Sequence, residues 1–109
     1  MLRSTFTYLN CALQHEALNR GPWKDLEKYE RDLSLQYSVH VTIYVLFDSS
    51  PERVPGGAAI PKGFIKTIKF NSKQVQFYFP NTDVRGLKWR EFSISEQELM
   101  DYIFTHHST

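Results

Sequence analysis

Apolar and polar side chains alternate over residues 33–47, and this alternation restricts the possible folds of the 109-residue chain more than any other feature. Every odd position from Leu33 to Phe47 is apolar, and Ser, Gln, His or Thr occupies most of the even positions between them. A period of two is typical of a β-strand with one buried face. Because strands usually have about 3 to 10 residues, we place the strand at 37–47 and assign 33–36 to the end of a helix or to a bulge.

Helices are predicted on both sides of this strand. Apolar residues recur at helical spacing from Phe6 onward, and the run Arg-Gly-Pro at 20–22 is typical of a helix end, which predicts a first helix at 5–19. Proline favours the first turn of a helix, so a second helix is predicted at 22–32. A Ser followed three residues later by Glu forms a capping box that predicts a last helix at 95–104.

The remaining periodic segments predict three more strands. Residues 64–70 and 75–79 form a hairpin, and 87–94 form the last strand after a turn. The segment 48–63 holds three of the five prolines and three of the five glycines, so we expect a flexible loop there. Parity places five apolar residues on one face of the hairpin: Phe64, Ile68, Val75, Phe77 and Phe79.

The predicted elements follow the order α-α-β-β-β-β-α. Strands joined mainly by short connections form an antiparallel sheet, and amphipathic helices can cover one of its faces. We therefore predict an α+β fold in which a roughly four-stranded antiparallel sheet and the helices on one face make a two-layer sandwich. A chain of this length suits a single domain over 1–109, with a short polar tail at 106–109.

Cysteine content and hydropathy indicate a cytoplasmic protein. Cys11 is the single cysteine and cannot form an internal disulfide, and Met1 is not followed by the apolar run of a signal peptide. The most apolar stretch, 39–47, is less than half as long as a membrane-spanning helix requires. We expect no membrane partner, no cofactor and no metal.

Charge is distributed unevenly along the chain, although the formal net charge is only +1. Residues 62–90 contain seven basic residues and one acidic residue, whereas 91–109 contain four acidic residues and no Lys or Arg. Strand parity then predicts a basic and aromatic sheet face opposite the hydrophobic one. The candidate contact residues on that face are His40, Tyr44, Lys69, Tyr78, Lys88 and Arg90.

Such a face suits an anionic macromolecule, because Lys and Arg neutralise negative charge and Tyr provides a flat contact surface. The chain carries no motif of a known activity, so we predict a small, non-enzymatic binding protein that acts as an inhibitor, accessory or immunity protein, as in phages and mobile elements. The favoured partner is a protein with an acidic surface. A nucleic-acid-binding module that uses the same face is the alternative, and the oligomeric state is left open.

Enzymatic and metal-binding alternatives have weaker support in the sequence. Cys11 and His15 are four residues apart on the predicted first helix, where an imidazole could activate a thiol, but no orienting third group is evident. His106 and His107 could complete a zinc site with this pair. A weak metal-independent ribonuclease would centre on His40, with Tyr44, Lys69 and Arg90 around the phosphate. The prediction is therefore that there is no catalytic and no metal site.

Overall fold

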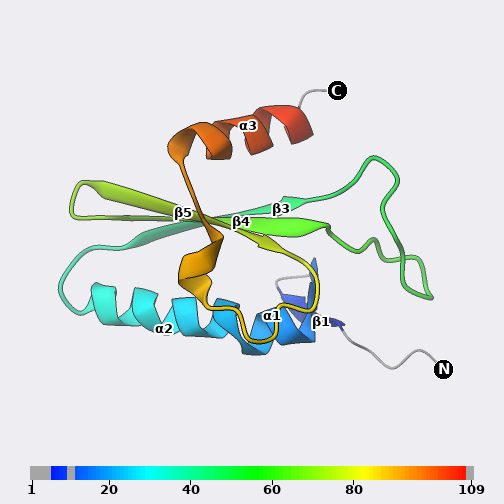
Figure 1. The fold of residues 1–109 in the computed structure, drawn as a ribbon, viewed down its shortest axis with the longest axis horizontal. Coiled ribbons are helices and arrows are strands. Elements are labelled where there is room, and N and C mark those ends of the chain that lie inside the picture. Colours follow the sequence, from blue (N-terminus) through cyan, green and yellow to red (C-terminus); the bar gives the residue numbers. More distant parts are fainter. Residues whose placement is uncertain (1–5, 10–11, 108–109) are drawn as a thin grey trace.

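The computed structural model describes residues 6–9 and 12–107 of the chain (Figure 1). Two short strands, two consecutive helices, a three-stranded meander, a 3₁₀ turn, a last short strand and a final helix follow one another. Their bounds are β1 Phe6–Leu9, β2 Ala12–His15, α1 Glu16–Arg20, α2 Pro22–Ser34, β3 His40–Leu46, β4 Gly63–Phe70, β5 Lys73–Pro80, η1 Trp89–Phe92, β6 Ser93–Ile94 and α3 Glu96–His107.

The main sheet has four antiparallel strands in the order β3-β4-β5-β6, and β1 and β2 form a separate two-stranded sheet. The predicted α+β class and the four-stranded antiparallel sheet are therefore confirmed. The helices, however, do not all lie on one face: Figure 1 shows α1 and α2 on one side of the sheet and α3 on the other. The side chains of α3 pack against strand residues that point away from α2, so helices cover both faces.

The larger core lies between the sheet and α1 and α2. Phe64, Phe79 and Trp23 are buried there, and the indole packs edge-on against both phenyl rings at centroid distances of 5.6 and 5.4 Å. Ile68 and Phe77 belong to the same cluster. Four of the five residues that parity assigned to the inner face of the hairpin are fully buried in this core, and Val75 packs partly buried against it.

The smaller core lies between the opposite sheet face and α3. Ile65, Leu46 and Leu99 are buried in it, and Tyr78 stacks on Tyr102 of α3 with 4.5 Å between ring centroids and 11° between ring planes. This contact follows from the sequence, because the residues that alternate with the inner set on β3, β4 and β5 are themselves partly apolar. A strand that is apolar on both faces is buried on both faces.

The N-terminal segment differs from its prediction. Residues 6–9 and 12–15 are paired antiparallel strands, with Phe6 opposite His15, and only Glu16–Arg20 form the helix α1 that was expected over 5–19. Asn81 explains the difference: its amide donates to the carbonyl of Leu13 and its carbonyl oxygen accepts from the His15 N–H. These bonds hold β2 extended, and the partner lies 66 residues away from His15, beyond the reach of a local sequence pattern.

The predicted strand at 87–94 is also wrong over most of its length. Only Ser93 and Ile94 pair with β5, and Trp89–Phe92 form a 3₁₀ turn. The Glu91 carboxylate accepts the N–H of Lys88 at 2.6 Å and closes this turn. The Trp89 ring contacts Phe77 edge-on. Trp89 is therefore packed against the core as the alternating pattern suggested, but it lies on a turn and not on a strand.

Other boundaries lie close to their predictions. The helix α2 extends to Ser34, β3 begins at His40, and α3 continues through His107 into the segment expected as a tail. Between β3 and β4, an isolated antiparallel bridge joins Arg53 to Ala59. In the part of the chain that the structure describes, no helix combines the length and the apolar character needed to cross a membrane.

An ion pair is buried at the centre of the larger core. Lys66 is 1% exposed on β4, its ammonium lies 2.8 Å from the Glu30 carboxylate of α2, and it sits 4.0 Å from the centroid of the Trp23 ring. A cation in this position needs a counter-charge, because an unpaired buried charge is strongly destabilising. Glu30 therefore joins α2 to the sheet through charge as well as through packing.

Replacing Glu30 tests how much this ion pair stabilises the fold. The Glu30→Ala variant leaves the Lys66 ammonium without its partner, and we expect the free energy of unfolding to fall by about 3 kcal/mol. Asp32→Ala, an exposed position on the same helix, is the matched control and should change it by less than about 0.5 kcal/mol. Urea unfolding of both variants measures the difference. Equal stabilities would show that the pair contributes nothing to the fold.

The helix α3 covers the second sheet face, and this burial changes the ionisation of Tyr78. Burial raises the pKa of Tyr78 above its ordinary value of 10.0, and the nearby Tyr102 and Asp48 add to the rise. The folded state thus favours the protonated phenol, so this contribution to stability is present below about pH 10 and is lost as the pH rises through the raised pKa.

We expect a late component in the tyrosine absorbance titration of the folded protein, and Tyr78→Phe should remove it. Tyr37→Phe, on an exposed side chain after α2, is the control and should leave the late component in place. A titration that is unchanged by Tyr78→Phe would contradict the packing of α3 on this face.

Candidate functional site

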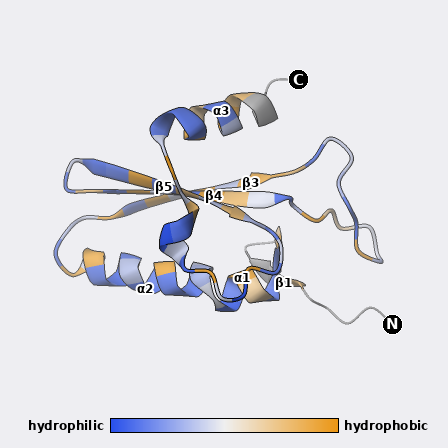
Figure 2. Cartoon of the chain, in the orientation of Figure 1, coloured by the Kyte–Doolittle hydropathy of each residue, from blue (hydrophilic) through white to orange (hydrophobic). Residues whose placement is uncertain are grey.

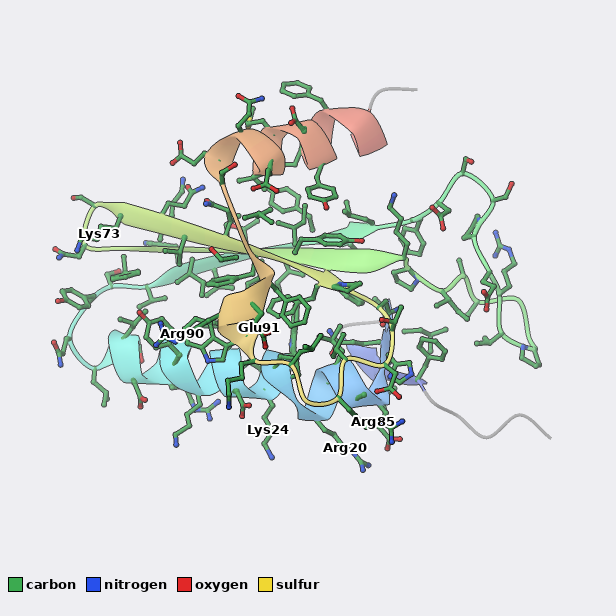
Figure 3. The ribbon with its side chains drawn as sticks, viewed as in Figure 1. Arg20, Lys24, Lys73, Arg85, Arg90 and Glu91 are labelled. Atoms are coloured by element: carbon green, nitrogen blue, oxygen red, sulfur yellow. The ribbon has the colours of Figure 1, made fainter. Side chains whose placement is uncertain are left out.

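The six residues predicted as one contact face lie on two sides of the molecule. His40, Tyr44, Lys69 and Tyr78 share a face of the sheet, as parity required, with His40 directly opposite Lys69. Lys88 and Arg90 do not, because the chain leaves the sheet after Pro80. The Arg90 guanidinium stacks over the Trp89 ring at 4.4 Å and lies 5.9 Å from the Tyr29 ring of α2, and Figure 3 shows it beside that helix.

The four predicted residues on the sheet face do not form one open surface. Tyr44 and Tyr78 pack against the core under α3 and are only half exposed. His40 and Lys69 are exposed at the end of the sheet that carries the β4–β5 turn. There they line a shallow groove of about 480 Å³ together with Lys73 and Glu96. The structure therefore keeps His40 with Lys69 and separates both of them from Lys88 and Arg90.

A larger groove, of about 680 Å³, lies where β2 joins α1 and where the chain passes after β5. It brings together an imidazole, three cations and three carboxylates from four separate segments. Its charged and titratable lining residues are His15, Glu16, Arg20, Asp25, Asp83, Arg85 and Lys88. In Figure 3 Arg20 and Arg85 lie close together at this end, whereas Lys73 marks the opposite end of the molecule.

His15 is held in this groove by three contacts. Its backbone N–H donates to the Asn81 side chain at 2.6 Å, and its Nδ1 accepts the N–H of Ala17 at 3.0 Å, which caps α1. The Phe6 ring packs against the imidazole at a centroid distance of 5.4 Å. Because Nδ1 is an acceptor here, the neutral ring carries its proton on Nε2. The arrangement fixes the ring and leaves Nε2–H as the donor.

Both guanidinium groups in the groove are paired with carboxylates. Arg85 donates to both oxygens of Asp83, each at 2.9 Å from Nε, and Arg20 lies 2.7 Å from Glu16. Hydrogen bonding to Arg85 lowers the pKa of Asp83 and raises that of Arg85. Asp83 and Glu16 therefore orient the two cations at the mouth of the groove, where both guanidinium groups are exposed.

A second feature of this junction is a buried amide that lacks a full set of partners. Gln14 is fully buried on β2, and its carbonyl oxygen accepts the side-chain amide of Asn19 at 2.8 Å. Within the described residues, neither the Gln14 amide nitrogen nor the hydroxyl of Thr7, its cross-strand neighbour, has a hydrogen-bond partner. Buried polar atoms are rarely left unpaired in proteins. These two atoms are therefore suited to hold a buried water between β1 and β2.

Metal-ligating side chains are not gathered in the described part of the chain. Residues 6–9 and 12–107 contain no group of three or more His, Cys, Asp or Glu that could hold a metal ion. Among the side chains that line the larger groove, the carboxylate of Asp25 has the oxygen donors that hard cations prefer. The Cys11 thiol and the side chains of His106 and His107 lie outside the described residues, so the nucleophile and zinc hypotheses that used them stay untested.

Sequence reasoning considered His15 only as a neighbour of Cys11 and missed the remainder of the junction. Gln14 and Asn19 carry no local signal, since isolated amides occur throughout soluble proteins. Asn81 follows Pro80 in a turn, which is an ordinary position for asparagine. Asn81 reaches the backbone of Leu13 and His15 across 68 and 66 residues of sequence, whereas Gln14 and Asn19 bond to each other within a local segment.

Comparison with known proteins identifies what kind of chain carries this groove. The family model described as DNA/RNA non-specific endonuclease matches residues 1–107. A search of curated proteins gave no match. The family match corrects four predictions made from the sequence: that the protein is not an enzyme, that it is a binding protein, that it is an inhibitor or immunity protein, and that its favoured partner is an acidic protein. With almost the whole chain matched, the protein belongs to the DNA/RNA non-specific endonuclease family.

Proposed function

We propose that this protein cleaves phosphodiester bonds of nucleic acid in the groove at the β2–α1 junction. The observation that carries the proposal is the endonuclease family match over residues 1–107. The groove supports it, because it is the larger of the two grooves described above and places His15 among three cations. An imidazole N–H beside cations is suited to stabilising a phosphate whose negative charge must be neutralised.

The cations suit substrate binding through phosphates. Arg20 and Arg85 are exposed at the groove mouth, and Lys88 lines the same groove. Phosphate contacts position a nucleic acid without reading its bases. Binding of this kind fits a nuclease that acts on both DNA and RNA without sequence preference.

Hydrolysis requires that a water oxygen bonds to phosphorus while the bond to the leaving oxygen breaks. In the proposed arrangement, a carboxylate accepts the proton of the attacking water, His15 Nε2–H donates a hydrogen bond to the phosphate as its negative charge develops, and the leaving oxygen takes its proton from solvent. Asp25 is the candidate acceptor, because the other two carboxylates of the groove, Glu16 and Asp83, are in ion pairs with Arg20 and Arg85.

Replacing each of two histidines decides where the chemistry takes place. His15→Ala should lower the cleavage rate by about 100-fold or more. His40→Ala, in the groove at the other end, is the matched control and should stay within about twofold of the parent rate. Single-stranded DNA, duplex DNA and RNA are incubated with each protein, in Mg²⁺ and in chelator, because phosphodiester hydrolysis is often metal-assisted. Circular dichroism confirms that both variants are folded.

Three results would overturn the proposal. Full activity of His15→Ala would remove His15 from the reaction, and loss of activity in His40→Ala would move the site to the other groove. Failure of the parent protein to cleave any of the three substrates under either condition would contradict cleavage itself.

Salt dependence of binding tests the phosphate contacts separately from the chemistry. Arg85→Ala combined with Lys88→Ala should weaken binding of a labelled single strand and reduce the slope of log affinity against log salt by about 1.4, or roughly 0.7 for each lost contact. Lys69→Ala combined with Lys73→Ala is the matched control in the other groove and should leave the slope unchanged. Fluorescence anisotropy in chelator measures both. The opposite pattern would place the phosphate contacts in the other groove, beside Lys69 and Lys73.

A further inference from the structure

A second groove continues the one proposed for the substrate. It lies between the helix α2 and the 3₁₀ turn η1 and has a volume of about 390 Å³. Asp25 and Lys88 line both grooves, so a strand that leaves the larger groove past Lys88 enters the second one directly. Figure 2 shows mainly hydrophilic residues on α2 and η1. The second groove is therefore a polar surface, although two of the residues that line it are aromatic.

The aromatic residues of this groove form a stack that ends in a guanidinium group. The Tyr29 ring of α2 stacks on the Trp89 ring of η1, with 4.8 Å between ring centroids and 30° between ring planes. The Arg90 guanidinium lies over the Trp89 ring at 4.4 Å, and Arg90 is exposed. Phe77 of the sheet packs edge-on against Trp89 at 5.5 Å and supports the stack from the core. The outer face of the guanidinium is thus a planar surface that is open to a ligand.

Three cations line this groove, and two carboxylates lie among them. The cations are Lys28, Lys88 and Arg90, and the carboxylates are Asp25 and Asp32. In the part of the chain that the structure describes, none of the three cations forms an ion pair. Both arginines of the larger groove, by contrast, are paired with carboxylates. A phosphate in the second groove therefore meets a cation that has no ion pair to break.

This combination of flat groups and unpaired cations fits a single strand of nucleic acid. Proteins that bind single strands place cations along the backbone and provide aromatic rings or guanidinium planes on which bases stack. Because the two carboxylates offset two of the three cations, charge alone attracts a strand only weakly. A base stacked on the guanidinium adds a contact that does not depend on a phosphate. Bases inside a duplex are stacked between their neighbours and cannot make this contact without leaving the stack.

We infer that the groove between α2 and η1 binds an unpaired base of the substrate, which stacks on the Arg90 guanidinium while Lys88 contacts the adjacent phosphate. The inference rests on the proposed function, since the base belongs to the strand whose phosphate lies in the larger groove. It names a substrate class: single-stranded nucleic acid gains a contact that a duplex lacks. Stacking accepts every base, so the groove adds no sequence preference.

Strands with and without bases separate stacking from phosphate contacts. Fluorescence anisotropy in chelator measures the binding of three labelled probes: a single strand with cleavage-resistant phosphorothioate linkages, an abasic strand of the same length and linkages, and a duplex. We expect the parent protein to bind the strand with bases roughly tenfold more tightly than the abasic strand, because a stacked base contributes affinity of this order.

Replacing Arg90 by lysine removes the planar group and keeps the charge. Arg90→Lys should therefore reduce the preference for the strand with bases to about threefold or less, and should leave the binding of the abasic strand and of the duplex unchanged. Arg53→Lys, at an exposed residue between β3 and β4, is the matched control and should keep the full preference. Circular dichroism confirms that both variants are folded.

The outcomes distinguish failure of this inference from failure of the proposed function. Equal affinity of the parent protein for the strands with and without bases would overturn the base contact and leave the phosphate contacts of the larger groove in place. An Arg90→Lys protein that keeps the full preference would do the same. A parent protein that binds neither strand would overturn substrate binding in both grooves.

Discussion

Asn81 joins the strand β2 to the place where β4 begins and β5 ends. Its amide donates to the carbonyls of Leu13 and Pro61 at 2.9 Å each, and its carbonyl oxygen accepts the N–H of His15. The side chain is buried, so each lost bond would leave an unpaired polar group in the interior, which is costly. The position of the β1–β2 hairpin, and with it the imidazole of His15, depends on this one residue.

The sheet provides the rigid support for that junction because it is packed on both faces. Phe64 and Phe79 face α2, and Ile65 and Tyr78 face α3. The buried ion pair between Lys66 and Glu30 also fixes the position of α2 on the sheet. The segment after β5 starts from this fixed frame and returns along α1 and α2, where it brings Arg85 and Lys88 opposite His15.

Predictions from the sequence succeeded where local periodicity is decisive. The hairpin of β4 and β5 was found because the alternation along its two strands places Phe64, Phe77 and Phe79 on one face. Prediction failed where a distant contact overrides the local pattern: Asn81 keeps 12–15 extended, and Glu91 turns the chain at Lys88. Parity could not place Arg90, since it lies on a 3₁₀ turn and not on a strand.

The candidate site could be predicted only in part. His40 and Lys69 were correctly placed together, but His15 was seen only as a neighbour of Cys11, and the buried amide of Gln14 was missed. The enzymatic class was considered only as an alternative, a ribonuclease centred on His40, because the chain carries no short motif that specifies nuclease chemistry. The family match shows that class from similarity over the whole chain, which no single stretch of residues reveals.

Binding of nucleic acid in the groove at the β2–α1 junction, as proposed above, can be observed directly by NMR. Backbone amide resonances of the ¹⁵N-labelled protein can be followed while a short single strand with cleavage-resistant phosphorothioate linkages is added. The account predicts that the resonances of His15, Arg20, Arg85 and Lys88 shift in proportion to binding, while those of His40, Lys69 and Lys73 do not. Shifts confined to the second group would contradict it and would place the substrate at the opposite end of the sheet.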